Sequence, residues 1–273
     1  MEIPNERSMR FVYARYRVAE PMSANLARTL PVMLAELQAN QQEAGKYSWT
    51  IGDIGERTIA GEKLLFGRLG KTARATGATS GGGSIHSSGR KSTPGKKAAC
   101  SNFFIDPQNS IMALEDKPLL PAEKFLKKFK QFWETTQTAE IDFDFLQNEP
   151  EIFAAINQWD RITAARFELS SAHACPREEL KQLNDLLRHS KASRAVFKFE
   201  GGASGLARDN SIIQEGVSLS AAGYGKFGLK GVADGAKTAL DSDSFLLAND
   251  LVEVDDLPSL APVILAAIRK IPG

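Results

Sequence analysis

The sequence predicts an α+β fold of mixed, largely antiparallel sheets with packed helices and one long disordered basic loop. Several segments alternate apolar and polar side chains, as in Met9–Val18 and Glu140–Phe145, which is the pattern of a strand with one buried face. Others repeat apolar residues every three or four positions, as in Pro121–Trp133, which is the pattern of an amphipathic helix. Turn sequences such as Asp234-Gly235 separate alternating runs and predict hairpins.

In the first half of the chain, each element follows from a local signal. Pro21 ends the first strand, and Ser23 can cap the helix that follows. The turn signal Asp106–Asn109 joins two strands of a hairpin, and Pro121 opens a helix with lysines on its polar face. The expected elements are a strand at Met9–Val18, a helix at Ser23–Ala39, strands at Lys46–Ile54 and Arg57–Leu69, a hairpin of Ser101–Ile105 with Ser110–Glu115, and a helix at Pro121–Trp133.

The second half alternates strands and helices before a final hairpin. Small residues such as Gly216 and Ser220 suit one helix for close packing against a sheet, and Gly223-Tyr224-Gly225 ends that helix. The expected elements are strands at Glu140–Phe145, Thr163–Leu169 and Ala195–Phe199, helices at Glu151–Trp159, Arg177–Arg188 and Asn210–Ala222, a hairpin around Asp234-Gly235, and a closing helix at Pro258–Ile271.

Length and composition bound the domain organisation. A chain of 273 residues fits one large domain or two small ones. The favoured division is an N-terminal α+β region at 1–136, containing the basic loop 70–98, and a C-terminal α+β region at 137–273. A single intertwined domain fits the same pattern equally well.

Charge is distributed very unevenly along the chain. The formal net charge is only +1, yet Lys63–Ile105 contains no Asp or Glu. The basic residues of this stretch are Lys63, Arg68, Lys71, Arg74, Arg90, Lys91, Lys96 and Lys97. Within it, Gly70–Ala98 is almost free of large apolar residues and should form a long disordered loop, since it cannot bury enough surface to offset its ordering entropy. Local charge of one sign in a neutral protein indicates a surface that meets a polyanion.

A second basic surface is expected on the final hairpin. Alternation turns Phe227 and Leu229 inward, so that Lys226 and Lys230 face outward. A two-residue Asp234-Gly235 turn pairs Val232 with Lys237 and puts that lysine on the same face, together with Asp241. Lysines that guard an exposed sheet edge would give the same pattern. The candidate nucleic-acid-binding residues are Arg68, Lys71, Arg74, Arg90, Lys91, Lys96, Lys97, Lys226, Lys230 and Lys237.

Several classes of site are disfavoured, and no cofactor is expected. The His and Cys residues are scattered, which disfavours zinc, and two cysteines cannot make a disulfide scaffold. Neither Gly70-Lys71-Thr72 nor the segment around Gly89 completes a phosphate-binding P-loop. The chain has no apolar run long enough to cross a bilayer and no apolar signal segment at Met1–Arg7, so a cytoplasmic location without membrane insertion is expected.

The acidic strand keeps an enzymatic alternative open. Glu140, Asp142 and Asp144 share one face and have the spacing of a divalent-metal site, as a nuclease would need. The solvent-facing side of a half-buried strand explains them better. Asp53, Glu62 and Lys63 lack the acid-any-lysine spacing of a nuclease motif. The sequence therefore favours a protein that is not an enzyme, with a nuclease or other effector enzyme and a protein–protein scaffold as alternatives.

The order of motifs resembles one family. The strand Phe11–Arg17 is followed by the hairpin Ser101–Glu115, then by Gly205-Leu206-Ala207 and by Ala222–Gly231. This order is similar to that of RexA-like phage-exclusion and bacterial defence proteins, across about residues 9–245. The resemblance implies an α+β homodimer that binds DNA with little sequence preference in a phage-defence or prophage system. It also implies a partner protein encoded nearby, and the Gly/Ser/Lys loop departs from it.

Together, the charge pattern and the resemblance predict a cytoplasmic protein that binds nucleic acid, with duplex DNA as the expected form. Binding would be independent of sequence, because the basic residues would contact phosphates.

Overall fold

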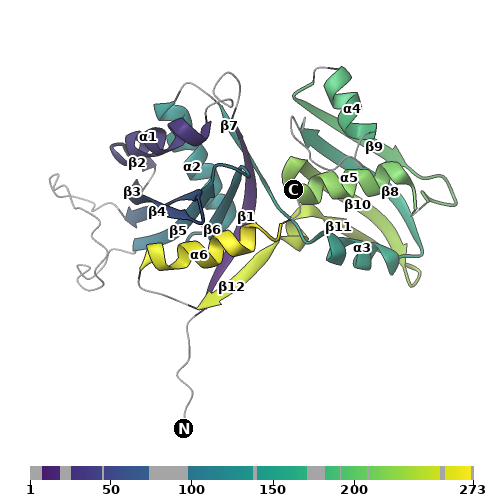
Figure 1. Cartoon of the computed structure of the whole chain (residues 1–273). Helices are drawn as coiled ribbons and strands as arrows, with labels where there is room; N and C mark the ends of the chain where they lie inside the picture. The colour runs from purple at the N-terminus through teal and green to yellow at the C-terminus, as the bar shows by residue number, and fades with distance from the viewer. Residues whose placement is uncertain are drawn as a thin grey trace, which may run out of the picture. The chain divides into compact units, whose positions relative to one another are not determined.

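A computed structural model describes residues 8–18, 26–44, 46–73, 98–137, 140–170, 182–190, 192–207, 209–252 and 256–271. Antiparallel sheets and packed helices confirm the α+β fold (Figure 1). The contacts between residues divide the chain into two compact units, which are described separately below. Unit 1 contains Tyr16–Asp142 and Asn249–Lys270, and unit 2 contains Phe143–Ala248; the start of the chain is shared between them.

Among the described residues, unit 1 is built on a large sheet of eight strands. Their order is β12-β1-β6-β5-β4-β3-β2, and β7 pairs with β1 outside this path. The pairs from β2 to β6 are all antiparallel. The strands are β1 (Ser8–Val18), β2 (Gln41–Ala44), β3 (Tyr47–Ile59), β4 (Glu62–Ala73), β5 (Ala98–Asp106), β6 (Ile111–Glu115), β7 (Ile141–Phe145) and β12 (Ala248–Val252).

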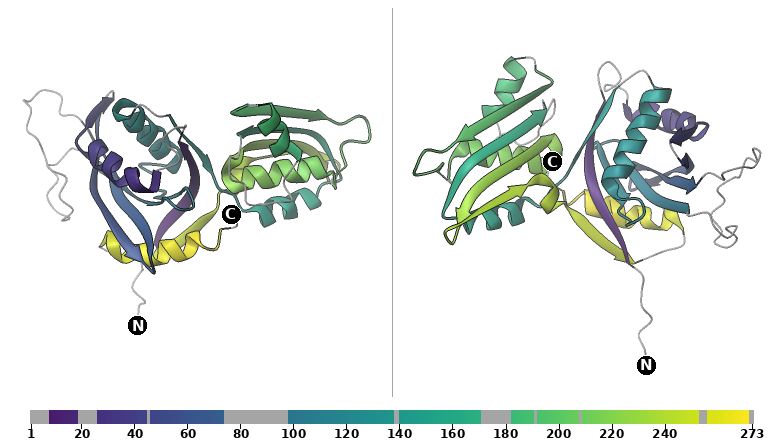
Figure 2. Two further views of the ribbon diagram at one scale, coloured as in Figure 1. Left: turned by 45° about the horizontal axis from the view of Figure 1, so that its top comes forward. Right: turned by 180° about the vertical axis from the view of Figure 1, so that it is seen from behind.

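In the described ranges, the helices that pack on this sheet are α1 (Leu26–Gln38), α2 (Ala122–Thr136) and α6 (Leu257–Ile268). The ring of Phe103 on β5 packs edge-on against Phe125 and Phe129 of α2, with centroids 5.7 and 5.5 Å away. Helix α6 contacts β3, β4, β5 and β6, and Arg269, just after its end, forms an ion pair with Glu62 on β4. Helices α2 and α6 lie on opposite faces (Figures 1 and 2). Alternate residues of β4 and β5 therefore meet different helices.

Unit 2 is an antiparallel sheet with helices on one face. The strand order is β11-β10-β8-β9. The strands are β8 (Arg161–Ser170), β9 (Arg194–Glu200), β10 (Gly225–Ala233) and β11 (Ala236–Asp241). The helical segments are α3 (Glu149–Asn157), α4 (Gln182–His189), α5 (Ser211–Leu219), the wider turn η2 (Ser220–Tyr224) and the short 3-10 helix η3 (Ser242–Phe245). Residues from α3, α4 and α5 join inward-facing residues of β8 and β10 in one core.

Helix α5 lies very close to the sheet, as its small residues predict. A Cβ atom at Gly216 would stand 2.7 Å from ring carbons of the fully buried Phe167 on β8, so any larger residue would force the ring or the helix to shift. The residue before it, Glu215, has a buried carboxylate that accepts hydrogen bonds from the backbone N–H groups of Gln182 and Leu183, at 3.2 and 2.8 Å. It thereby satisfies donors in the first turn of α4 that have no partner within that helix.

Some sequence-based boundaries were wrong. The turn expected between Ile54 and Arg57 lies instead at Ala60-Gly61, and the irregularity near Gly55 is a bulge within β3. The proposed loop begins too early, because Gly70–Ala73 belong to β4 and pair with β3. Strands β2 and β12 were not predicted, and the rest of the expected disordered loop, 74–97, lies outside the described residues.

The two units combine segments that are far apart in the sequence. The chain passes between units near residue 142, and α6 returns to unit 1 although its sequence follows the whole of unit 2. Helix α6 does so because its apolar residues, including Leu260, Ile264 and Ile268, are buried and its contacts are with the sheet of unit 1. In the described part of the chain, no helix is both long and apolar enough to span a membrane.

Two buried tyrosines on β1 predict a loss of stability at high pH. Burial raises the pKa of Tyr13 from 10.0 to about 12, and burial together with the charge of Asp106 raises that of Tyr16, against a hydrogen bond with Ser110 that lowers it. The neutral phenols are favoured in the fold, so their contribution is complete below pH 10. Above pH 10 only the unfolded chain ionises, and each tyrosine should reduce stability by roughly 1.4 kcal/mol per pH unit until its folded pKa is reached.

Urea unfolding at pH 9, 10, 11 and 12 measures this loss, and the Tyr13→Phe variant should lose less stability over the same range than the wild type. Equal pH dependence in the two proteins would contradict the assignment to Tyr13.

Candidate nucleic-acid interface

One face of the unit 2 sheet has no helix on it, in the described part of the chain, and we call it the open sheet face. Helices α3, α4 and α5 lie on the other side, and the view from behind in Figure 2 shows the four strands in front of them. Strand register identifies the residues that face outward. The basic ones are Arg161, Arg166, Arg194, Lys198, Lys226, Lys230 and Lys237, and the acidic ones are Glu168, Glu200 and Asp241.

The hairpin register agrees with the sequence prediction. Asp234 and Gly235 both have positive φ, at 49° and 74°, as a two-residue turn of this kind requires. Val232 pairs with Lys237, and Asp241 pairs with Gly228 on the same outward face. Strand β10 lies between β11 and β8, so its lysines are on a central strand. Protection of a sheet edge can therefore explain Lys237 on β11 but not Lys226 or Lys230.

The basic side chains of this face differ in whether they already have a partner within the protein. Arg166 and Arg194 share the carboxylate of Glu168, at 3.7 and 3.0 Å. Arg161 donates a hydrogen bond to the carbonyl oxygen of Ala203. Four exposed lysines take part in no ion pair with the described residues, and these are Lys198, Lys226, Lys230 and Lys237. Their charges are available to an anionic partner.

Several positions between these lysines carry a small side chain or none. At Gly228, in the middle of β10, a Cβ atom would meet nothing within 4 Å, so a ligand can approach the backbone there. The uncharged residues that face outward on the four strands are small, such as Ala164, Val196 and Ala239. No aromatic side chain faces outward on these strands, which disfavours stacking of unpaired bases and suits contact with phosphates.

In unit 1, Arg68 and Lys71 project from opposite faces of β4, because they are three positions apart on the strand. The guanidinium of Arg68 forms an ion pair with Asp53 at 2.9 Å and donates a hydrogen bond to Asn102 at 3.0 Å. Lys71 donates to the carbonyl oxygen of Leu119 at 2.7 Å and has no acidic partner in the described part of the chain. The structure thus does not bring these two candidates together.

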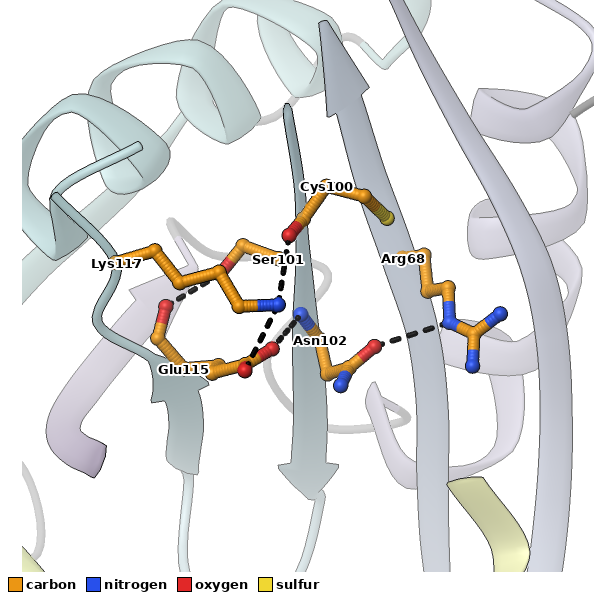
Figure 3. A network of polar contacts seen from close by, with 6 residues as sticks. All are labelled: Arg68, Cys100, Ser101, Asn102, Glu115 and Lys117. Atoms are coloured by element: carbon orange, nitrogen blue, oxygen red, sulfur yellow. Dashed lines mark hydrogen bonds and ion pairs between the residues drawn. The ribbon is translucent and has the colours of Figure 1, made fainter. Parts of the chain in front are cut away.

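The network around Arg68 is drawn in Figure 3. Glu115 on β6 is only 2% exposed and forms an ion pair with Lys117 at 2.8 Å, and it accepts a hydrogen bond from the backbone N–H of Asn102 at 3.1 Å. Lys117 also donates to the carbonyl oxygen of Cys100, whose thiol pKa is raised mainly by burial. Glu115-Asp116-Lys117 has the acid-any-lysine spacing that sequence reasoning missed, but here the two charges neutralise each other.

The acidic strand does not have the expected uniform exposure. Asp142 is exposed and forms an ion pair with Lys130 of α2, whereas Asp144 is only 3% exposed. The interpretation of all three acids as a solvent-facing row is therefore wrong at Asp144. Among the described residues, no group of three or more His, Cys, Asp or Glu side chains is arranged to hold a metal ion.

The remaining candidates belong to the loop. Arg74, Arg90, Lys91, Lys96 and Lys97 lie outside the described residues, and their part in binding stays a prediction. Sequence reasoning did not select Arg161, Arg166, Arg194 or Lys198, which the pairing of β8 with β9 and β10 brings onto the open sheet face. The alternation of Arg166 with buried Ala165 and Phe167 is visible in the sequence, but the strands that pair with β8 are not.

Comparison with known proteins leaves the chemistry of this surface as the main guide to function. No family model matches the chain, and no curated protein was found to be similar to it in sequence.

Proposed function

We propose that this protein binds nucleic acid through the phosphate backbone, with the open sheet face of unit 2 as the contact surface and duplex DNA as the preferred form. One observation carries the proposal: four lysines without an acidic partner among the described residues stand on a sheet face that no described helix covers. Lysines on neighbouring strands are held at fixed spacings by the sheet, so little backbone entropy is lost when they meet a rigid polyanion.

The spacing of these lysines suits a duplex. Lys226 and Lys230 are four residues apart on β10, which at the usual rise of a strand is about 13 Å. This distance is close to the ~12 Å width of the major groove of B-DNA, whose two edges are rows of phosphates. The outward side chains include no aromatic rings and no Asn or Gln amides, and the three arginines already contact Glu168 or the Ala203 carbonyl oxygen. The unpaired charge of this face therefore suits contacts with phosphates, which carry no sequence information.

The biological setting is proposed from the resemblance to RexA-like proteins. It suggests a component of a phage-defence or prophage system that is not an enzyme, acts as a homodimer in the cytoplasm and works with a partner protein encoded nearby. The basic loop would add phosphate contacts to those of the open sheet face. For a nuclease, the acidic strand would have to supply metal ligands, and the burial of Asp144 and the ion pair of Asp142 do not favour this.

We expect affinity for duplex DNA to fall steeply with salt and to be the same for a scrambled sequence. Each neutralised phosphate contributes about −0.9 to the slope of log K against log salt, so four lysine contacts predict a slope of about −3.6. Fluorescence anisotropy with a labelled 30-base-pair duplex at 50, 100 and 200 mM NaCl measures it. A slope near zero, or a strong preference for one sequence, would overturn the proposal.

A further inference from the structure

Unit 1 carries a second concentration of positive charge, gathered around two aromatic rings on β3. The ammonium groups of Lys71, Lys124 and Lys128 lie 5.9, 6.0 and 5.3 Å from the centroid of the Trp49 ring. Lys71 and Lys46 lie 5.0 and 5.7 Å from the centroid of Tyr47, and the two rings are 6.5 Å apart. We call this set the lysine–aromatic patch: Lys46, Lys71, Lys124 and Lys128 over Tyr47 and Trp49.

The fold brings these residues together from distant parts of the sequence. Trp49 pairs with Lys71 across β3 and β4, so their side chains share the face of the sheet that α2 covers. Lys124 and Lys128 are four residues apart on α2 and therefore lie on one side of that helix. The Trp49 ring is only 2% exposed, so it cannot stack on a ligand; it supports the lysines from beneath by cation–π contacts.

No lysine of the patch forms an ion pair with any acid among the described residues. The partners that they do have are neutral: Lys71 donates to the Leu119 carbonyl oxygen at 2.7 Å, and Lys128 donates to the Gln131 side-chain oxygen at 2.6 Å. Lys130, two residues further along α2, is different, because it forms ion pairs with Glu134 and Asp142. The same helix thus holds paired charge at Lys130 and unpaired charge at the patch.

The pKa values of Lys128 and Lys130 differ because only Lys130 has acidic partners among the described residues. Burial lowers the pKa of Lys128, and the charges of Lys124 and Lys127 lower it further. Burial alone would also lower the pKa of Lys130, but its hydrogen bond with Asp142 and the nearby carboxylates outweigh burial and raise it. The free protein therefore holds like charges close together at the patch without a counter-charge from the described residues, which an anion bound there would supply.

We infer that the lysine–aromatic patch is an anion site that takes a phosphate group. The aromatic rings and the Leu119 carbonyl hold the ammonium groups in place, and these supply several N–H donors to one compact anion. The site is separate from the open sheet face and does not depend on the function proposed for it. The phosphate could belong to a nucleic-acid backbone or to a free nucleotide or pyrophosphate.

The test follows individual lysines by NMR after reductive methylation with labelled formaldehyde, which keeps their positive charge. Adding pyrophosphate should shift the methyl signals of the patch lysines in a saturable way and raise the pKa of Lys128. The double variant Lys71→Gln, Lys128→Gln should lose at least tenfold in pyrophosphate affinity. Shifts of equal size at all lysines, including Lys63, would mean general screening and would overturn the site.

Lys130→Gln is the matched control, because it removes one charge from the same helix where that charge is already paired. It should bind pyrophosphate as the wild type does. Thermal melts of every variant exclude unfolding as the cause of lost binding. If the ammonium groups served only to stabilise the fold by covering Trp49, the double variant would melt at a lower temperature and pyrophosphate would not shift the patch signals in the wild type; that result contradicts the inference.

A second arm identifies the source of the phosphate. A 30-base-pair duplex is added to a variant with Lys226, Lys230 and Lys237 replaced by Gln, so that the open sheet face is weakened. Shifts at the patch lysines would assign the site to a nucleic-acid backbone, and shifts with pyrophosphate alone would assign it to a small phosphate ligand. Either result supports the site, whereas failure of the wild type to bind the duplex would overturn only the proposed function.

Discussion

Replacing Lys226, Lys230 and Lys237 together by Gln should reduce affinity for duplex DNA by about 10²–10³-fold at 0.1 M salt. Each lysine that contacts a phosphate contributes about 0.9 to the slope of log K against log salt, so three lost contacts are worth nearly three decades at this concentration. The salt slope should become shallower by about three. The side chains are exposed, so the fold should tolerate Gln. Anisotropy titrations over a range of salt concentrations give both quantities.

A matched control removes the same charge elsewhere. Lys63, Lys130 and Lys270 are on unit 1, and Lys63 and Lys130 already form ion pairs with acids. Their joint replacement by Gln leaves the same net charge as the first variant and should change affinity only a few-fold. Equal losses in the two variants would show that only net charge matters and would count against a defined surface.

A third variant measures how much the basic loop contributes to the affinity for duplex DNA. Replacing Arg90, Lys91, Lys96 and Lys97 by Gln removes one more charge than the sheet variant does. We expect the loss per charge to be smaller than for the three lysines of the sheet, whose positions the hairpin fixes. Unchanged affinity in the sheet variant, with a large loss in the loop variant, would transfer the proposed contact from the open sheet face to the loop.

The part of the open sheet face that could be predicted from the sequence depends on a tight turn and on alternation along two adjacent strands. The Asp234-Gly235 turn fixes the register of the hairpin, and alternation then assigns Lys226, Lys230 and Lys237 to one face, so all three were found. Arg166 and Lys198 join them only because β8 pairs with β10 and β9. Pairing between strands that are far apart in the chain leaves no local signal, and these residues were missed.

Element boundaries failed where the local signal was weak or misleading. The glycines at 52 and 55 resemble a turn, but β3 passes through them with a bulge and turns later, at Ala60-Gly61. Strand β2 is short and lacks any apolar alternation. The buried Asp144 interrupts the expected pattern of β7. The lysine–aromatic patch could not be foreseen either, since it needs β3, β4 and α2 to meet.

Replacing Gly216 by Leu should destabilise unit 2 by roughly 3 kcal/mol, at the upper end of the usual cost of overpacking. Any side chain at this position begins 2.7 Å from the ring of Phe167, which is fully buried in the core shared by α5 and the sheet. Hydrogen exchange of backbone amides measures the effect in each unit. Amides of β8 and β10 should exchange much faster than in the wild type, and those of β4 and β5 should change little.

Two further variants separate close packing from other effects of losing a glycine. Gly228→Ala should leave exchange unchanged, because a Cβ atom there meets nothing within 4 Å. Gly216→Ala adds a single carbon and gains about 1 kcal/mol of helix propensity, so a net loss of stability would have to come from the clash with Phe167. Adding Phe167→Leu to Gly216→Ala should then recover part of that loss, since the two changes act on one contact. If Gly216→Ala instead stabilises unit 2, the close approach of α5 to β8 is not required for the stability of this unit.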